Sequence, residues 1–301
     1  MEQWDRQYRL SAGQPGSTGF MIGSESSGRS LHISFSLEKS DTQSSNTGTI
    51  TISNLNDTHK AQLSEEDCYI ELAAGYSSNL GNIFSGWVDS TEEDLSGGDR
   101  DMKIEVIDGF LNTDLQGSIS LSGTVTCQAV VDACVEKLEV TSSVITEAAA
   151  EKLALAMYDN GFAFVGKYRA ALQNVCRKAG VTFSIQNGIL QIYVSGEAVT
   201  ESAYILSSKT GLISIPKKIT ISESNSNSGT SSDDDSDGTA ETGIPGYEVE
   251  YFLNPAIGVN DLVQVDSSQI TGFYRVHKLT ITGDNYTGDW KCTAQLIEID
   301  G

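Results

Sequence analysis

Short segments in which apolar and polar residues alternate recur along most of the chain, and this pattern constrains the fold more than any other feature. In Leu31–Leu37 every second residue is apolar, which is the pattern of a half-buried β-strand. Gly48–Asn54 repeats the pattern beyond the polar turn Asp41–Thr47, so the two segments are expected to form a hairpin. Further strands are expected at Cys68–Tyr76, Asn82–Glu92 and Asp101–Gly109.

Regular short strands separated by turns are typical of a β-sandwich or barrel. With 301 residues, the chain has room for about two domains. We therefore assign residues 1–115 to a first β-domain, which includes a short helix near Asp57–Leu63.

A helical period replaces the alternation after residue 115. Cys127–Leu138 places its apolar residues on one stripe, and Thr124 and Thr126 precede it as candidate N-caps. Tyr168–Ala179 repeats this design and ends at Gly180, a typical C-cap. Residues 116–180 are therefore expected to form an α+β insert.

A strong hairpin signal follows the second predicted helix. Asn187-Gly188 separates two short apolar segments within Val181–Tyr193, and this dipeptide favours a tight β-turn. The polar, acidic tract Ser222–Thr242 has no apolar residue that could anchor it, so we expect a loop or linker there. Strand patterns return at Gly246–Leu253, Asp261–Asp266, Gly272–Thr282 and Gly288–Ile299.

Composition excludes several classes of protein. The net charge of −22 disfavours binding to phosphate backbones, because like charges repel, and it serves mainly to keep the protein soluble. No apolar run of about 18 residues occurs, so no membrane span is expected. Met1–Leu10 lacks the apolar core of a secretory signal.

The cysteines show no redox or metal-binding spacing. They are odd in number and never form a C-x-x-C pair, and Cys127 and Cys134 fall on one helical face, as core residues would. Reduced, buried thiols in a protein assembled in a cytoplasm are the simplest interpretation. The five are Cys68, Cys127, Cys134, Cys176 and Cys292.

No catalytic, cofactor-binding or metal-binding residue is predicted. His32, His59 and His277 are expected at the surface, and there is no G-x-S-x-G, Walker, G-x-G-x-x-G or H-E-x-x-H motif. The acidic triplets that begin at Glu65 and Glu92 look like solvated loop charge.

One segment of the acidic tract matches half of a calcium-binding loop. Asp233, Asp235, Asp237 and Gly238 match the first half of an EF-hand loop, but Ile244 stands where the final glutamate belongs. We therefore assign no metal, and whether the tract binds Ca²⁺ or is simply disordered stays open.

Several segments, taken in order, resemble the baseplate hub proteins of contractile phage tails and related injection machines. Among them are TISNL at the end of Leu31–Leu55, FSGWV in Ile83–Val88, FSIQNGILQI in Gly161–Ile192 and LSSKTGLIS in Leu206–Ser214. The resemblance is greatest in Gly246–Ile299, which contains LNP, GFYRVHK and GDW. The acidic tract has no counterpart in the family.

This resemblance implies a mainly β fold in which two tail-tube-like β-barrel or sandwich domains, residues 1–115 and 181–301, flank the insert at 116–180. The loop at 222–242 would interrupt the second domain, which would begin near Thr182–Tyr193. Gly272–Thr282 would be a central strand of that domain, and Trp290 would anchor its core.

The resemblance also implies a structural, non-enzymatic role. A homotrimer would form a pseudo-sixfold ring that adapts the sixfold tail tube to the threefold central spike and lines the channel for DNA ejection. Its partners would be the tail tube or tube-initiator protein above and the spike below, together with baseplate wedge and tape-measure proteins. The location would be the virion baseplate, assembled in the host cytoplasm.

Three points stay open at this stage. The first is whether acidic residues line the channel, where they would repel passing DNA. Whether the tail contracts is undetermined, because non-contractile tails carry related hubs. A tail-tip adhesin or receptor-binding β-protein, with Tyr76 or Tyr286 as binding residues, is the alternative, and a hydrolase is the third class.

Overall fold

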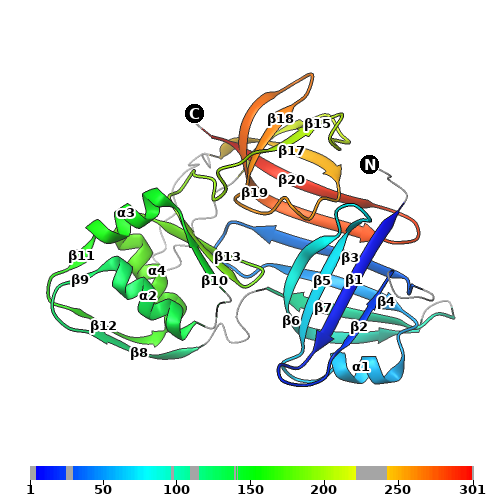
Figure 1. Ribbon diagram of the computed structural model, residues 1–301, viewed down its shortest axis with the longest axis horizontal. Coiled ribbons are helices and arrows are strands. Elements are labelled where there is room, and N and C mark those ends of the chain that lie inside the picture. The colour runs from blue at the N-terminus through cyan, green and yellow to red at the C-terminus, as the bar shows by residue number, and fades with distance from the viewer. Residues whose placement is uncertain are drawn as a thin grey trace, which may run out of the picture.

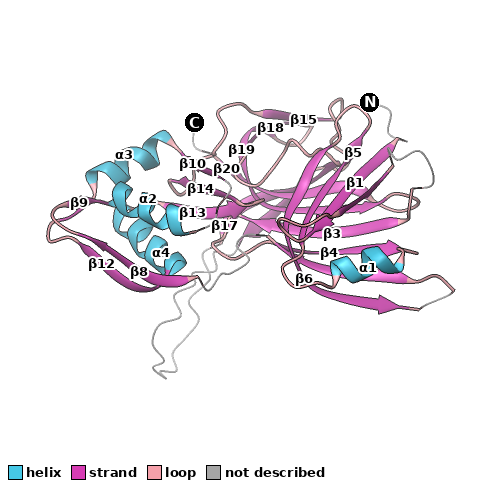
Figure 2. Cartoon of the chain, turned by 60° about the horizontal axis from the view of Figure 1, so that its bottom comes forward, coloured by secondary structure: helices cyan, strands magenta, loops and turns pink. Residues whose placement is uncertain are grey.

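The computed structural model of the chain describes residues 5–24, 30–95, 98–108, 115–138, 140, 142–221 and 243–299. It is mainly β, with a helical insert at one end (Figures 1 and 2). This confirms the predicted fold class. The predicted loop at 222–242 and the aspartates Asp233, Asp235 and Asp237 lie outside the described residues.

Four strands of the first β-region form what we call the N-terminal unit. In sheet order they are β3 (Ile33–Ser40), β4 (Thr47–Ser53), β7 (Asp101–Ile107) and β6 (Gly81–Asp94). The sheet continues through β5 (Tyr69–Tyr76), β1 (Arg6–Gly13) and β2 (Phe20–Gly23), which cross in front of the unit in Figure 1. The predicted short helix is α1 (Asp57–Leu63), where the Asn56 side chain accepts a hydrogen bond from the His59 backbone N–H.

Four later strands form the C-terminal unit. In sheet order they are β16 (Lys217–Ile221), β17 (Ile244–Phe252), β20 (Trp290–Glu298) and β19 (Thr271–Asp284). The first half of β19 pairs with β18 (Leu262–Asp266), and β18 pairs in parallel with β15 (Tyr204–Ser207). The predicted central strand is therefore confirmed as β19, which is paired on both sides.

The two units have the same construction. All ladders within each unit are antiparallel, and the last strand of each has 14 residues. A β-bulge interrupts that strand at one residue in each unit, Asp89 in β6 and His277 in β19. When the bulges are aligned, the buried pair Ile50–Ile104 matches the buried pair Val249–Ala294. The chain therefore carries the same four-stranded unit twice.

The second half of β19 pairs with β3 and joins the two units into one sheet. A single hydrophobic core extends beneath both of them. Trp290 contributes to this joint, because its ring meets Phe35 edge-on at 5.4 Å and its Nε1–H donates to the Gly75 carbonyl at 3.1 Å. The prediction that Trp290 anchors the core is confirmed, since only 4% of the residue is exposed.

The insert has its own core between helices and short strands (Figure 2, left). The predicted helices form as α2 and α4, with Thr126 as the N-cap of α2 and Gly180 as the left-handed C-cap of α4. A third helix, α3, was not predicted. The elements of the insert are β8 (Gln116–Leu121), β9 (Val125–Thr126), α2 (Cys127–Lys137), β10 (Ser142–Ile145), α3 (Glu147–Leu155), β11 (Met157–Tyr158), β12 (Phe162–Lys167), α4 (Tyr168–Ala179), β13 (Thr182–Gln186) and β14 (Ile189–Tyr193).

The hairpin β13–β14 forms as predicted but lies in a different place. Asn187 and Gly188 both have positive φ, 53° and 75°, as a tight hairpin turn requires. The hairpin pairs with β10 in a separate three-stranded sheet, and Phe183 and Ile192 are buried in the core of the insert. It therefore does not begin the second β-domain as expected, because its apolar face packs against helices and not against the large sheet.

Candidate assembly site

The turn of the β13–β14 hairpin is held at the centre of the molecule by a buried carboxylate. Asp108, 1% exposed, accepts hydrogen bonds from the backbone N–H groups of Asn187 at 2.6 Å and Gly188 at 3.1 Å. Lys39 donates to the Asn187 side chain at 2.6 Å, and burial lowers the pKa of Lys39 to about 8. The N-terminal unit thereby fixes the tip of the insert through charged and polar groups.

A second buried polar network ties the insert to both units. Arg275 on β19 donates to the carboxylate of Asp41 at 2.5 Å and to Asn260 at 2.7 Å. Asn260 in turn donates to Gln191 on β14 at 2.9 Å. Burial alone would raise the pKa of Asp41, but the hydrogen bond to His277 and the charge of Arg275 outweigh it, so the pKa is lowered. The three parts of the chain are thus joined through buried charged and polar side chains.

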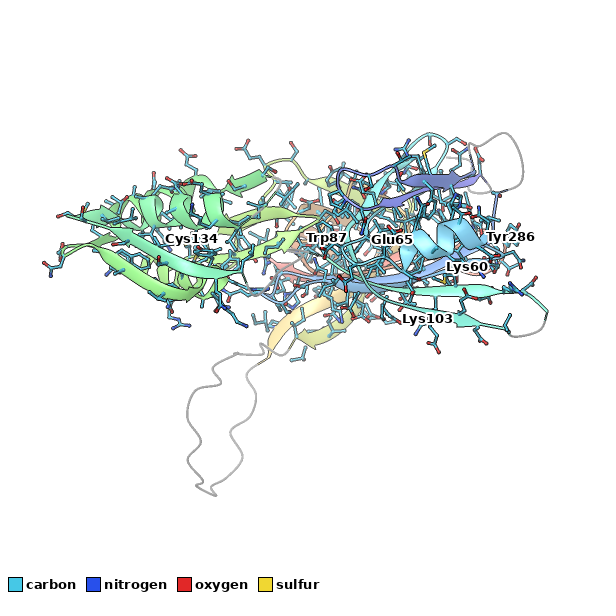
Figure 3. All side chains as sticks on the ribbon, turned by 90° about the horizontal axis from the view of Figure 1, so that it is seen from below. Lys60, Glu65, Trp87, Lys103, Cys134 and Tyr286 are labelled. Carbon is cyan, nitrogen blue, oxygen red and sulfur yellow. The ribbon has the colours of Figure 1, made fainter. Side chains whose placement is uncertain are left out.

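The face of the joined units that points away from the core is rich in hydroxyl groups and ion pairs. Lysines pair with glutamates there, between neighbouring strands at 2.9 Å for Lys291–Glu250 and 3.0 Å for Lys278–Glu38, and within β7 at 2.7 Å for Lys103–Glu105. In the view from below, Lys103 lies on this sheet and Lys60 on α1 (Figure 3). Most of the charge on this face is therefore locally balanced.

Several strands have an unpaired edge among the described residues. β16 and β2 end the large sheet, and β10 ends the three-stranded sheet of the insert. Unpaired strand edges present backbone N–H and C=O groups that pair readily with another chain. The exposed apolar residues Ile213 and Ile215 lie just before β16, and exposed Leu95 directly follows β6.

The predicted surface histidines are only partly exposed. His277 lies 2.8 Å from the Asp41 carboxylate with 20% of its side chain exposed, because the bulge turns it out of the regular alternation. His32 stacks on Tyr286 and lies 3.2 Å from Asp284, and His59 stacks on Phe20.

The two tyrosines considered as binding residues of an adhesin differ in solvent exposure. Tyr76 is buried and cannot contact a receptor, since 2% of it is exposed, whereas Tyr286 is 61% exposed. Tyr286 lies at the end of the molecule opposite the insert helix that carries Cys134 (Figure 3).

The structure brings no catalytic constellation together from the acidic candidates. The residues of both triplets, Glu65–Asp67 and Glu92–Asp94, are exposed. Within the described residues no group of three or more His, Cys, Asp or Glu could hold a metal ion. No described helix has the length and apolar character needed to cross a membrane.

All five cysteines are buried and unpaired, as predicted. Burial raises the thiol pKa of Cys134 and of Cys176 to about 12. Thiols with so high a pKa stay protonated and unreactive at neutral pH.

One groove among the described residues is acidic. It has a volume of about 980 Å³ and lies between the insert and the end of β20. Glu147, Glu151, Glu201 and Glu298 contribute to its wall.

Comparison with known proteins gives a match in structure but not in sequence. No family model and no curated protein matches the chain. Among solved structures, the tail protein of Neisseria meningitidis MC58 has a TM-score of 0.61 and 12% identity, covering 97% of this chain and 96% of its own. The 43 kDa tail protein of prophage MuSo2 from Shewanella oneidensis has a TM-score of 0.60 and 9% identity, covering 98% of each chain.

A third similar structure comes from a secretion machine. A component of the type VI secretion system of E. coli, described as similar to the T4 bacteriophage tail proteins gp27 and gp5, has a TM-score of 0.55 and 9% identity. The match covers 90% of this chain and 74% of that one. The resemblance inferred from the sequence is therefore confirmed at the level of the fold, and the chain has the fold of the phage tail proteins.

Proposed function

We propose that this chain is a structural hub subunit of a phage-tail baseplate, and that three copies form a ring between the tail tube and the central spike. The observation that carries the proposal is the presence of two matched four-stranded units joined edge to edge within one chain. Three such chains supply six similar units around a threefold axis. A ring of this kind presents sixfold contacts on one side and threefold contacts on the other.

The polar face of the units is suited to line the channel of the ring. Its hydroxyl groups and balanced ion pairs offer a passing polyanion few cations to bind. The overall charge of −22 adds repulsion toward DNA. Both properties favour passage of DNA over adhesion to the wall.

The proposed partners follow from this geometry. The tail tube or tube-initiator protein would bind one rim and the spike the other, while wedge and tape-measure proteins would contact the outside and the channel. The location would be the virion baseplate, with assembly in the host cytoplasm. We assign the protein no catalytic activity, cofactor or metal.

The mass of the purified chain in solution tests the proposal. We expect a trimer by light scattering or native mass spectrometry, and threefold rings with a central hole in negative-stain images. Co-expressed tube and spike proteins should co-purify with it. If the protein stays monomeric at all concentrations and binds cell-wall glycan, the hub proposal is wrong and the adhesin alternative is favoured.

A further inference from the structure

In the part of the chain that the structure describes, each four-stranded unit leaves one strand edge without a partner strand. The first half of β6 pairs with β5, but beyond Val88 the strand pairs only with β7. Among the described residues no other segment forms a backbone hydrogen bond with Asp89–Asp94. Helix α1 approaches this half of β6 only through side chains, with Lys60 at 3.2 Å from Glu93. In the other unit, no strand that the structure describes pairs with β16 on the side away from β17.

The equivalent edges of the two units already pair with each other inside the chain. In the aligned units, β6 corresponds to β19 and β16 corresponds to β3. The second half of β19 pairs with β3. We infer that the second half of β6 pairs in the same way with β16 of a second copy of this chain. The inference rests on the proposed ring, for which it specifies the contact between subunits.

Strand direction is compatible with this pairing in a ring. The eight strands from β16 to β6 are antiparallel to their neighbours at every step. Because their number is even, β16 and β6 run in opposite directions. Copies related by rotation about the ring axis keep their direction, so β6 of one copy meets β16 of the next in antiparallel orientation.

The internal junction also predicts the register between subunits. Lys278 lies opposite Ser40 at the start of the internal pairing, and the equivalent residues are Ser90 and Ile221. Four residues further along β19, Thr282 lies opposite Ser36. Transferred to the external edges, this pair becomes Asp94 opposite Lys217. The neighbouring pair, Glu93 opposite Lys218, follows from the same register.

Charge independently favours this register. Lys217 and Lys218 are both exposed, in a chain with only 19 basic residues, and the transferred register puts a carboxylate opposite each of them. The nearest internal carboxylate to Lys217 is that of Glu248, at 3.9 Å. Opposite charges facing each other across strands stabilise the pairing, whereas like charges oppose it.

A disulfide tests the register directly. In the variant Asp94→Cys/Lys217→Cys, oxidation of the full-length protein should give covalent dimers and trimers on a non-reducing gel. Residues directly opposite each other in antiparallel strands have the Cβ separation that a disulfide needs. Within one chain the two positions are separated by seven strand spacings, roughly 30 Å along the sheet, so no internal bond can form. Each single cysteine variant is the control, because the native cysteines are buried.

A charge swap tests the same contact without covalent chemistry. Lys217→Glu alone should raise the protein concentration for half-assembly by on the order of ten-fold or more, since it opposes like charges. Addition of Asp94→Lys should restore assembly. Lys209→Glu, an exposed change in the loop after β15, makes the same change in charge and should have no effect.

The outcomes separate the contact from the ring. A trimeric mass without cross-linked species, and with assembly insensitive to the swap, would overturn the β6–β16 contact and leave the ring standing. A chain that is monomeric at every concentration and forms no cross-link would overturn both. Cross-linked trimers that disappear in each single cysteine variant support the contact.

Discussion

The strand edges that join the two four-stranded units inside the chain differ in residue type from the equivalent edges on the outside. Where β3 and β19 meet inside the chain, Leu37 lies opposite Ile281, and both are buried. At the matching external positions the residues are Lys218 and Glu93, and both are exposed. Equivalent strand positions therefore carry two apolar residues at the internal junction and two charged residues at the external edges.

This difference separates folding from assembly. An apolar junction makes the two units fold together, because neither can cover its edge alone. Charged edges keep a free chain from indiscriminate strand pairing, since only an edge of complementary charge can approach. The chain can thus complete its own sheet first and recognise another copy afterwards.

The largest effect is expected when a charged residue is placed at the buried junction between β3 and β19. Ile281→Glu places a charge without a partner in a buried position, and we expect a loss of about 4 kcal/mol or more in the free energy of unfolding. Urea denaturation measures this loss. The change Lys218→Leu at the exposed external edge, which puts in the residue type of its equivalent Leu37, should alter the free energy of unfolding by less than about 1 kcal/mol. Similar losses in both variants would contradict the distinction between the junctions.

Trp290 offers the next largest contrast. Its equivalent in the N-terminal unit is Arg100, which is exposed just before β7, whereas Trp290 is buried between the units. Trp290→Ala should cost about 3–5 kcal/mol, because it leaves a cavity and an unpaired Gly75 carbonyl. Arg100→Ala should stay within about 0.5 kcal/mol. A loss below about 1 kcal/mol for Trp290→Ala would show that the joint does not depend on this ring.

The ends of β7 and β20 also differ in a way that can be tested. Asp108 follows β7 and holds the central turn, while the equivalent Glu298 is exposed at the end of β20. Asp108→Ala should cost about 2–3 kcal/mol, since buried N–H groups lose a charged acceptor. Hydrogen exchange should become faster in residues 182–193 in particular. Glu298→Ala is the matched control, and unchanged exchange in the hairpin would contradict the role of Asp108.

The last contrast concerns the dependence of stability on pH. Lys39 has a pKa of about 8 in the folded chain and 10.5 when unfolded. Between these values the unfolded chain binds more protons, so this residue makes stability rise with pH, by at most about 1.4 kcal/mol per unit. Below pH 8 the lysine is charged in both states and contributes no slope.

The variant Lys39→Met isolates this contribution. The stability difference between the original chain and the variant should change between pH 8 and 10.5 and stay constant below pH 8. The equivalent residue in the other unit is Thr220, which is exposed, so Thr220→Met should show no such change. Parallel stability curves for the original chain and Lys39→Met would contradict the lowered pKa.

The sequence predicts elements whose signals are local. The alternation of apolar and polar residues predicts β3 and β4, and an apolar stripe of helical period that ends at Gly180 predicts α4. The dipeptide Asn187-Gly188 predicts the β13–β14 turn. Helix α3 has an equally local signal, since Thr146 caps a segment rich in alanine, glutamate and leucine. The sequence therefore contains a local signal for this helix, although the helix was not predicted.

Pairings between distant segments could not be predicted in the same way. Nothing near β3 indicates that its partner is β19, more than 200 residues away, or that the hairpin would pair with β10. The bulge at His277 and the burial of Tyr76 likewise depend on neighbours that are remote in sequence. Alternation assigns a side chain to a face, but the tertiary fold decides whether that face is covered.

The pairing of Ile221 with Ile244 has a consequence for how the chain can change over time. These residues hold the two ends of the acidic tract side by side in the β16–β17 ladder. A connection between adjacent strand ends costs only about 0.6 kcal/mol more for each doubling of its length. New sequence can therefore enter the gene at this point without a change in register elsewhere, which gives evolution a permissive site within an otherwise tightly constrained sheet.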